Sequence, residues 1–288
     1  MKSRIPVLFL AAVLGSFASR VPAQDPAKSP IVYSIPEMGR VLVRQGIPYT
    51  SKDGPKLNMD IYYPPDMKNG ESLPAVVIAL GYANGVFETK LKDWEFYVSW
   101  GKLIAASGMI AVNYETTQPS RDIEDLMSHL RGNAAALKID ADRIGIWACS
   151  ANALTALTVL SGDRREFLRC AVLFYGLMLT PDQKYRDAVT ALTKQVAFSV
   201  QGIDKIKFIH SGLPMFIVRA GQDMDIFNQA IDHFVSAALA ANAPLILVNY
   251  AEGMHGFDLA NDSDQSRDII QQSLAFLKFH LNRKSDHQ

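Results

Sequence analysis

Ser150 is the residue best placed to act as a nucleophile. It follows the apolar run 144–147 and precedes an Ala/Leu/Thr-rich stretch, residues 151–160, of helical character. A serine at such a strand-to-helix turn projects its hydroxyl above the sheet edge, and the first N–H groups of the helix face any negative charge that develops there. Ala148 and Asn152 stand where the G-x-S-x-G pattern has glycines. The position predicts a nucleophilic serine on a turn made without those glycines.

His255 is the candidate base. A serine hydroxyl becomes a good nucleophile only when a base removes its proton and an acid orients that base. Among the six histidines of the chain, only His255 follows a predicted strand at its carboxyl end, in the loop 252–258. We therefore predict that it accepts the proton of Ser150.

The acid is expected in the loop 219–225, which follows another predicted strand and offers Asp223 and Asp225. Asp223 sits on the turn just beyond the strand, where a short carboxylate can reach a neighbouring loop, so we assign it as the acid. Asp225 lies closer to a helix predicted to begin near residue 228, and the positive end of that helix would favour a carboxylate.

The elements that must position these residues alternate between strand and helix. An antiparallel pair at 41–43 and 57–63 opens the pattern. Further strands are expected at 75–80, 109–114, 144–147, 171–175, 214–219 and 245–250, and helices at 93–106, 120–137, 151–160, 228–241 and 265–281. Such alternation predicts a mostly parallel sheet covered by helices on both faces, with ligands bound beyond the carboxyl ends of the strands.

Three motifs, in the stretches 140–150, 221–223 and 253–258, together resemble the α/β-hydrolases. The similarity is greatest to the secreted esterase and dienelactone-hydrolase-like branch, and it covers roughly residues 40–283. It implies an α/β-hydrolase fold with a Ser-His-Asp triad in the chain order Ser, Asp, His. It also favours the earlier aspartate of the acidic loop.

The resemblance further implies two backbone N–H donors for the oxyanion of the transition state. At the matching positions of this sequence they are those of Tyr82 and Ala151, although Leu80 replaces the histidine that usually opens the first loop. Two roles are open for Asn152: it occupies a glycine-like site, or its amide contacts the transition state.

The expected reaction is hydrolysis of a small-molecule carboxylic ester through an acyl-enzyme, with no cofactor and no metal. Dienelactone hydrolases use a cysteine nucleophile, but Cys149 stands one residue before the apex of the turn, where its side chain points elsewhere. A peptidase or lactone hydrolase with the same triad, and a non-catalytic binding protein with this fold, remain alternatives.

The chain is expected to divide into a signal peptide (1–23), a loose lead-in (24–40) and the hydrolase domain (41–284), with a small cap or an ordinary helix with long loops at 177–212. The basic start, the short apolar stretch 5–14 and the small residues before Gln24 are typical of export. That stretch is shorter than the roughly 20 residues that span a bilayer. We expect a secreted or periplasmic protein with no membrane contact after cleavage.

Composition bears on nucleic-acid partners and on disulfide bonds. The formal net charge of zero does not favour a nucleic-acid partner. The two cysteines, Cys149 and Cys170, fall at opposite ends of adjacent predicted strands, which is too far apart for a disulfide, so we predict two buried free thiols. The oligomeric state is left open by the sequence.

Overall fold

The computed structural model describes residues 24–49, 56–82, 84–161, 166–178 and 212–283, together with 183, 187 and 191. The strands among them are β1 (Leu42–Pro48), β2 (Asn58–Tyr63), β3 (Leu73–Ile78), β4 (Ile110–Tyr114), β5 (Ile139–Cys149), β6 (Leu168–Phe174), β7 (Met215–Ala220) and β8 (Leu245–Tyr250). The α-helices are α2 (Glu95–Ala106), α3 (Pro119–Gly132), α4 (Ala134–Leu137), α5 (Ala153–Leu160), α7 (Asp225–Ala240), α8 (Phe257–Ala260) and α9 (Asp264–Asn282), and the 3-10 helices are η1 (Pro36–Arg40), η2 (Leu91–Asp93) and η3 (Ser150–Asn152).

The strands form one eight-stranded sheet in the order β1-β2-β4-β3-β5-β6-β7-β8. β2 pairs antiparallel with β1 and β4, whereas all other neighbouring strands are parallel. The predicted architecture, an antiparallel start followed by a parallel sheet, is confirmed. Parallel strands end at one edge of a sheet, so the loops after β3, β5, β7 and β8 meet there.

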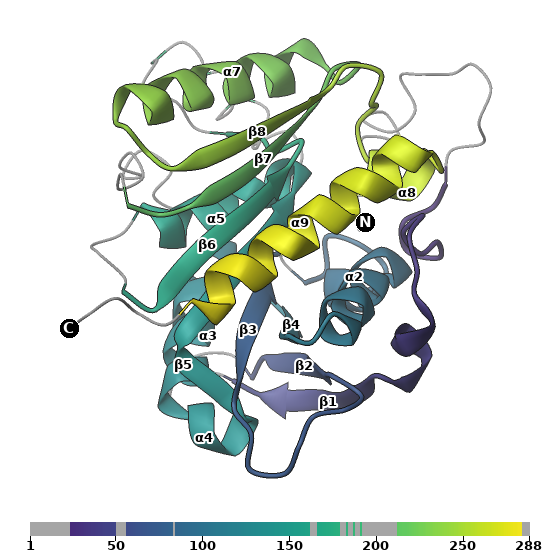
Figure 1. The fold of residues 1–288 in the computed structure, drawn as a ribbon, viewed down its shortest axis with the longest axis vertical. Coiled ribbons are helices and arrows are strands. Elements are labelled where there is room, and N and C mark those ends of the chain that lie inside the picture. The colour runs from purple at the N-terminus through teal and green to yellow at the C-terminus, as the bar shows by residue number, and fades with distance from the viewer. Residues whose placement is uncertain are drawn as a thin grey trace, which may run out of the picture.

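Helices cover both faces of this sheet. In Figure 1, α9 crosses one face of the sheet, and α3 and α5 lie behind the strands. Coverage on both sides explains why the inner strands are continuous apolar runs: every residue of β4 is buried, and so is every residue of β3 after the first. The edge strands β1 and β8 carry exposed positions.

Several predicted boundaries were wrong. The helix expected at 120–137 is two helices, α3 and α4, separated at Asn133, whose side chain donates to the carbonyl of His129. Asp93 does not cap α2; it lies in η2 and accepts from Lys92 Nζ at 2.6 Å. β5 begins at Ile139 rather than at residue 144, because Ile139 pairs with Leu73 of β3.

The segment before β1 is packed rather than loose. The Ile31 side chain is buried, and its backbone N–H donates to Ser99 Oγ on α2 at 3.0 Å. The N–H of Val32 donates to the carbonyl of Asp258 on α8 at 2.8 Å. The predicted signal peptide, 1–23, and most of the candidate cap, 177–212, lie outside the described residues.

Both cysteines are buried and free, as predicted. Cys149 pairs with Phe174 and Cys170 with Gly145, so the two thiols sit at opposite ends of the β5–β6 pair. In the described part of the chain no helix combines the length and apolar character needed to cross a bilayer.

Candidate active site

Ser150 lies on a tight turn where β5 ends, as the first residue of η3. Its φ of +55° is in the left-handed region, which few residues other than glycine adopt and which marks a strained turn. Asn152, by contrast, has φ −62° and ψ −19°, an ordinary helical conformation. The backbone of this turn therefore does not require a glycine at position 152. The side chain of Ser150 is partly exposed, at the strand edge where ligands bind.

His255 reaches this serine from the loop between β8 and α8. Its Nε2 lies 2.8 Å from Ser150 Oγ. The imidazole packs against the rings of Tyr175 and Phe227, each with its centroid 4.7 Å away. These two aromatic contacts restrict rotation of the imidazole, which keeps Nε2 directed at the serine.

Asp223 contacts the other nitrogen of this imidazole. Asp223 Oδ2 lies 2.7 Å from His255 Nδ1, and the Asp223 side chain has no exposed surface. An ionised carboxylate can only accept hydrogen bonds, so Nδ1 carries the proton and Nε2 accepts from the serine hydroxyl. The second carboxylate oxygen accepts from the N–H of Met224 at 2.7 Å. Asp225 is exposed in the first turn of α7.

Backbone contacts hold the loops of Asp223 and His255 together. The N–H of Gly221 donates to the carbonyl of Tyr250 at 2.7 Å, and that of Gln222 donates to the carbonyl of Gly253 at 2.8 Å. Gly221 approaches so closely that a Cβ there would lie 2.3 Å from the carbonyl oxygen of Ala251. This position therefore needs glycine because there is no space for a side chain.

Cys149 is placed unfavourably for a nucleophile. It is the last residue of β5, only 3% exposed, and it lies beneath the turn that presents Ser150. Burial raises the pKa of the Cys149 thiol well above its ordinary value, and the nearby carboxylate of Asp258 adds to this. The thiolate is the reactive form of cysteine, so this thiol is inert at neutral pH.

Asp258 is a buried acid near the site to which the sequence assigned no role. Its carboxylate accepts from Tyr175 Oη at 2.5 Å and from Trp100 Nε1 at 2.9 Å. Burial raises the pKa of Asp258 to about 6, although these two hydrogen bonds oppose the shift. Because the Tyr175 ring packs against the imidazole of His255, Asp258 fixes one wall of the histidine site.

The loop after β3, which carries the predicted oxyanion donor Tyr82, lies on the other side of Ser150. In this loop Leu80 donates its N–H to Tyr114 Oη at 3.1 Å. Gly81 donates its N–H to Asn152 Oδ1 at 2.7 Å, so this N–H is already engaged. Tyr82 is the next residue, and Ala151 directly follows Ser150 at the start of η3. The structure thus brings the two loops named by the sequence together through Asn152.

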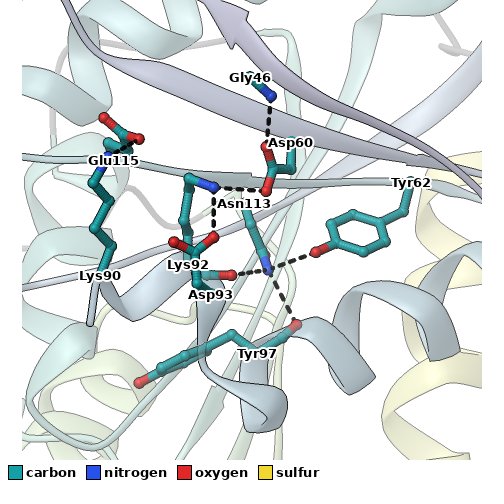
Figure 2. Close-up of polar contacts among 9 residues, drawn as sticks. All are labelled: Gly46, Asp60, Tyr62, Lys90, Lys92, Asp93, Tyr97, Asn113 and Glu115. Carbon is teal, nitrogen blue, oxygen red and sulfur yellow. Dashed lines mark hydrogen bonds and ion pairs between the residues drawn. The ribbon is translucent and has the colours of Figure 1, made fainter. Parts of the chain in front are cut away.

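A polar cluster, buried except for Asp93, supports the segment that leads from this loop into α2. Figure 2 shows Lys92 Nζ contacting the carboxylates of Asp60 and Asp93, at 2.8 and 2.6 Å. The amide of Asn113 donates to the carbonyl of Tyr97 at 3.1 Å. The cluster therefore links β2 and β4 to η2 and to the first turn of α2.

The described residues contain no group of three or more His, Cys, Asp or Glu side chains that could hold a metal ion. Apart from the backbone donors, the chemistry available at this edge of the sheet is that of a hydroxyl, an imidazole and a carboxylate in one hydrogen-bonded series. Such a series can activate the hydroxyl as a nucleophile and return its proton to a leaving group.

The sequence matches no protein-family profile and no curated protein. Among solved structures, an esterase from the Planctomycetes species Thermogutta terrifontis is similar with a TM-score of 0.64 at 18% identity, covering 88% of this chain and 97% of that chain. The α/β hydrolase LAE6 from the metagenome of Lake Arreo, Spain, a serine-to-alanine mutant, has a TM-score of 0.65 at 18% identity, covering 86% and 84%. At such identities the likeness establishes the fold, and the chain has the α/β-hydrolase fold that its motifs predict.

Proposed function

We propose that this protein is a serine hydrolase that cleaves small carboxylic esters. The observation that carries the proposal is the series Ser150 Oγ, His255 Nε2 and Nδ1, and Asp223 Oδ2, joined by contacts of 2.8 and 2.7 Å. The serine of that series sits on a strained strand-to-helix turn. This is the arrangement expected of a nucleophile, a base and an orienting acid.

In the proposed reaction Ser150 Oγ attacks the ester carbonyl carbon while His255 Nε2 takes the hydroxyl proton. The resulting oxyanion accepts hydrogen bonds from the N–H groups of Ala151 and Tyr82. Collapse of the tetrahedral intermediate breaks the bond to the alcohol oxygen, which receives the proton from His255. Water, deprotonated by the same imidazole, then attacks the acyl-enzyme and releases the acid and the free serine.

The structural neighbours support the ester as substrate and short acyl groups as a starting point. The Thermogutta esterase has been solved with bound butyrate and with bound propionate. It has also been solved phosphorylated by paraoxon and phosphoramylated by tabun. We infer that this chain acts on esters of small carboxylic acids, as the resemblance to the esterase and dienelactone-hydrolase-like branch also suggests.

The test combines hydrolysis of p-nitrophenyl esters of increasing acyl length with labelling by a fluorophosphonate, which needs an activated serine. Ser150→Ala is expected to lose labelling and to lower kcat by about 10⁴- to 10⁶-fold, as for other serine nucleophiles. Cys149→Ala, a substitution at the buried neighbouring residue, should keep most of the labelling and most of kcat.

An active Ser150→Ala variant with an inactive Cys149→Ala variant would reverse the assignment of the nucleophile. A wild-type protein that is neither labelled nor active on any ester would favour a non-catalytic binding protein with this fold. Turnover of lactones or peptides in preference to the esters would change the substrate class and leave the triad in place.

A further inference from the structure

Asn152 replaces the second glycine of the G-x-S-x-G pattern, and its side chain joins the turn of Ser150 to the loop after β3. It is 2% exposed. Its Oδ1 accepts from the N–H of Gly81 at 2.7 Å, and its Nδ2 donates to Tyr97 Oη at 2.8 Å. We propose that Asn152 is a positioning residue that fixes the oxyanion loop, residues 80–82, relative to Ser150. The proposal rests on the ester hydrolase function proposed above.

The contacts of the amide distinguish this role from the two that the sequence left open. A residue that merely occupied a glycine-like site would leave its polar atoms without specific partners. A residue that contacted the transition state would direct its N–H groups at the substrate oxygen. Here Nδ2 donates to Tyr97 and also lies 3.9 Å from Cys149 Sγ, inside the protein. The amide therefore acts on the loop and not on the substrate.

The hydrogen bond between Gly81 and Asn152 fixes the position of the next backbone donor, the N–H of Tyr82. Gly81 is buried, and a buried N–H without an acceptor costs free energy comparable to a lost hydrogen bond. Asn152 supplies that acceptor from two residues beyond the nucleophile. The preceding residue, Leu80, is fixed by Tyr114. Because Leu80 and Gly81 are both held, the N–H of Tyr82 has a defined position relative to Ser150. A misplacement of about 1 Å in such a site can lower the rate about 10²-fold.

The far end of the amide is anchored to the sheet. Tyr97 is buried on α2, and its carbonyl accepts from Asn113 on β4 at 3.1 Å. Figure 2 shows the phenol end of Tyr97 pointing away from Asn113 and the Lys92 cluster. The hydroxyl at that end accepts from Asn152. The contacts thus form a continuous path from β4 through Tyr97 and Asn152 to the oxyanion loop.

The experiment compares Asn152→Ala with Asn152→Asp and with a control, Thr155→Val. The aspartate keeps an oxygen for the Gly81 N–H, and its second oxygen can accept from the Tyr97 hydroxyl. Thr155 is buried on α5, the helix that directly follows Asn152, and its Oγ1 has no hydrogen-bond partner among the described residues. Two quantities are measured for each variant: the hydrogen–deuterium exchange rate of the Gly81 amide, and kcat and KM on one p-nitrophenyl ester.

Asn152→Ala is expected to speed Gly81 exchange about tenfold or more, because the hydrogen bond that protects it is gone. It should lower kcat by up to about 10²-fold, the effect of a misplacement of about 1 Å in such a site, while KM changes little. Asn152→Asp should keep most of the protection of the Gly81 amide and most of kcat, and Thr155→Val should change neither.

Unchanged Gly81 exchange in Asn152→Ala would overturn the proposal, and so would faster exchange with normal kcat or a loss confined to KM. If Asn152→Ala does not fold, an Asn152→Asp variant with wild-type stability but low kcat would also overturn it. A wild-type protein with no ester turnover would remove the proposed function and, with it, the catalytic role of Asn152. The exchange rate would then still report on the contact itself, so the two failures are distinguishable.

Discussion

On the His255 side of Ser150 the backbone does the positioning, whereas on the Gly81 side a side-chain amide does it. The loops of Asp223 and His255 are joined by backbone hydrogen bonds, and the glycine at position 221 lets them approach. The loop of Gly81 is joined to the nucleophile turn by Asn152 Oδ1. The same site thus holds its loops next to the reacting serine in two different ways.

The comparison explains why position 221 must be glycine whereas position 152 need not be. A glycine is needed where a Cβ would collide with backbone, as at Gly221. At position 152 the backbone is helical, so a side chain is tolerated and can take on a bond. Departure from a motif therefore does not by itself indicate a lost activity when the replacing side chain makes a contact of its own.

The largest expected effect on the His255 side comes from its acid. Asp223→Asn should lower kcat by about 10⁴-fold, as in a serine protease, because an amide no longer holds the imidazole in the tautomer that accepts the serine proton. Steady-state rates on one activated ester measure this. Asp225→Asn is the matched control: Asp225 is exposed at the start of α7 and should affect mainly stability. Near-normal turnover by the Asp223 variant would refute the assignment.

A smaller effect is expected from Gly221→Ala, which tests whether backbone contact positions this side. The added methyl would lie 2.3 Å from the carbonyl oxygen of Ala251, so the loops of Asp223 and His255 must separate. We expect kcat to fall by roughly 10- to 10²-fold and the free energy of unfolding to fall by about 1–3 kcal/mol. Urea unfolding and ester kinetics give both values.

Gly39→Ala is the control for that substitution, because nothing lies within 4 Å of a Cβ at that exposed position. It should leave the rate and the stability near those of the wild type. If Gly221→Ala behaves like Gly39→Ala, the loops are held by something other than their close approach, and backbone contact does not distinguish this side from the Gly81 side.

Local patterns were sufficient for the sheet and for the approximate position of the site. Continuous apolar runs predicted the inner strands, and the residues after their carboxyl ends predicted Ser150, Asp223 and His255 as neighbours. The boundaries that were wrong have two kinds of cause. The start of β5 is set by pairing with the distant Leu73, whereas the break at Asn133 goes with a side-chain hydrogen bond to His129, four residues earlier.

The supporting contacts of the site are also long-range. Asn152 and Gly81 are separated by 71 residues, and Trp100 and Asp258 by 158. No periodicity or spacing connects such pairs, because each residue meets its partner only after the sheet has formed. Asn152 could be flagged as a departure from a motif, but its role required its partners.

The smallest expected effect concerns Asp258, whose carboxylate lies behind the Tyr175 ring on the His255 side. Burial raises the pKa of Asp258 from 3.8 to about 6, so between these values the native state binds this proton more tightly than the unfolded chain. Its contribution to the free energy of unfolding is therefore greatest below pH 4 and is lost as the pH rises through about 6. Asp258→Asn removes the charge, and its amide can still accept from Trp100 and donate to Tyr175. As the pH rises from 5 to 8, the free energy of unfolding of the variant should increase relative to that of wild type. Urea unfolding should show an increase on the order of 1 kcal/mol. If the free energy of unfolding depends on pH in the same way in the two proteins, Asp258 does not titrate with folding. A large loss of kcat in the variant would show that the charge of Asp258 serves His255 directly rather than through Tyr175.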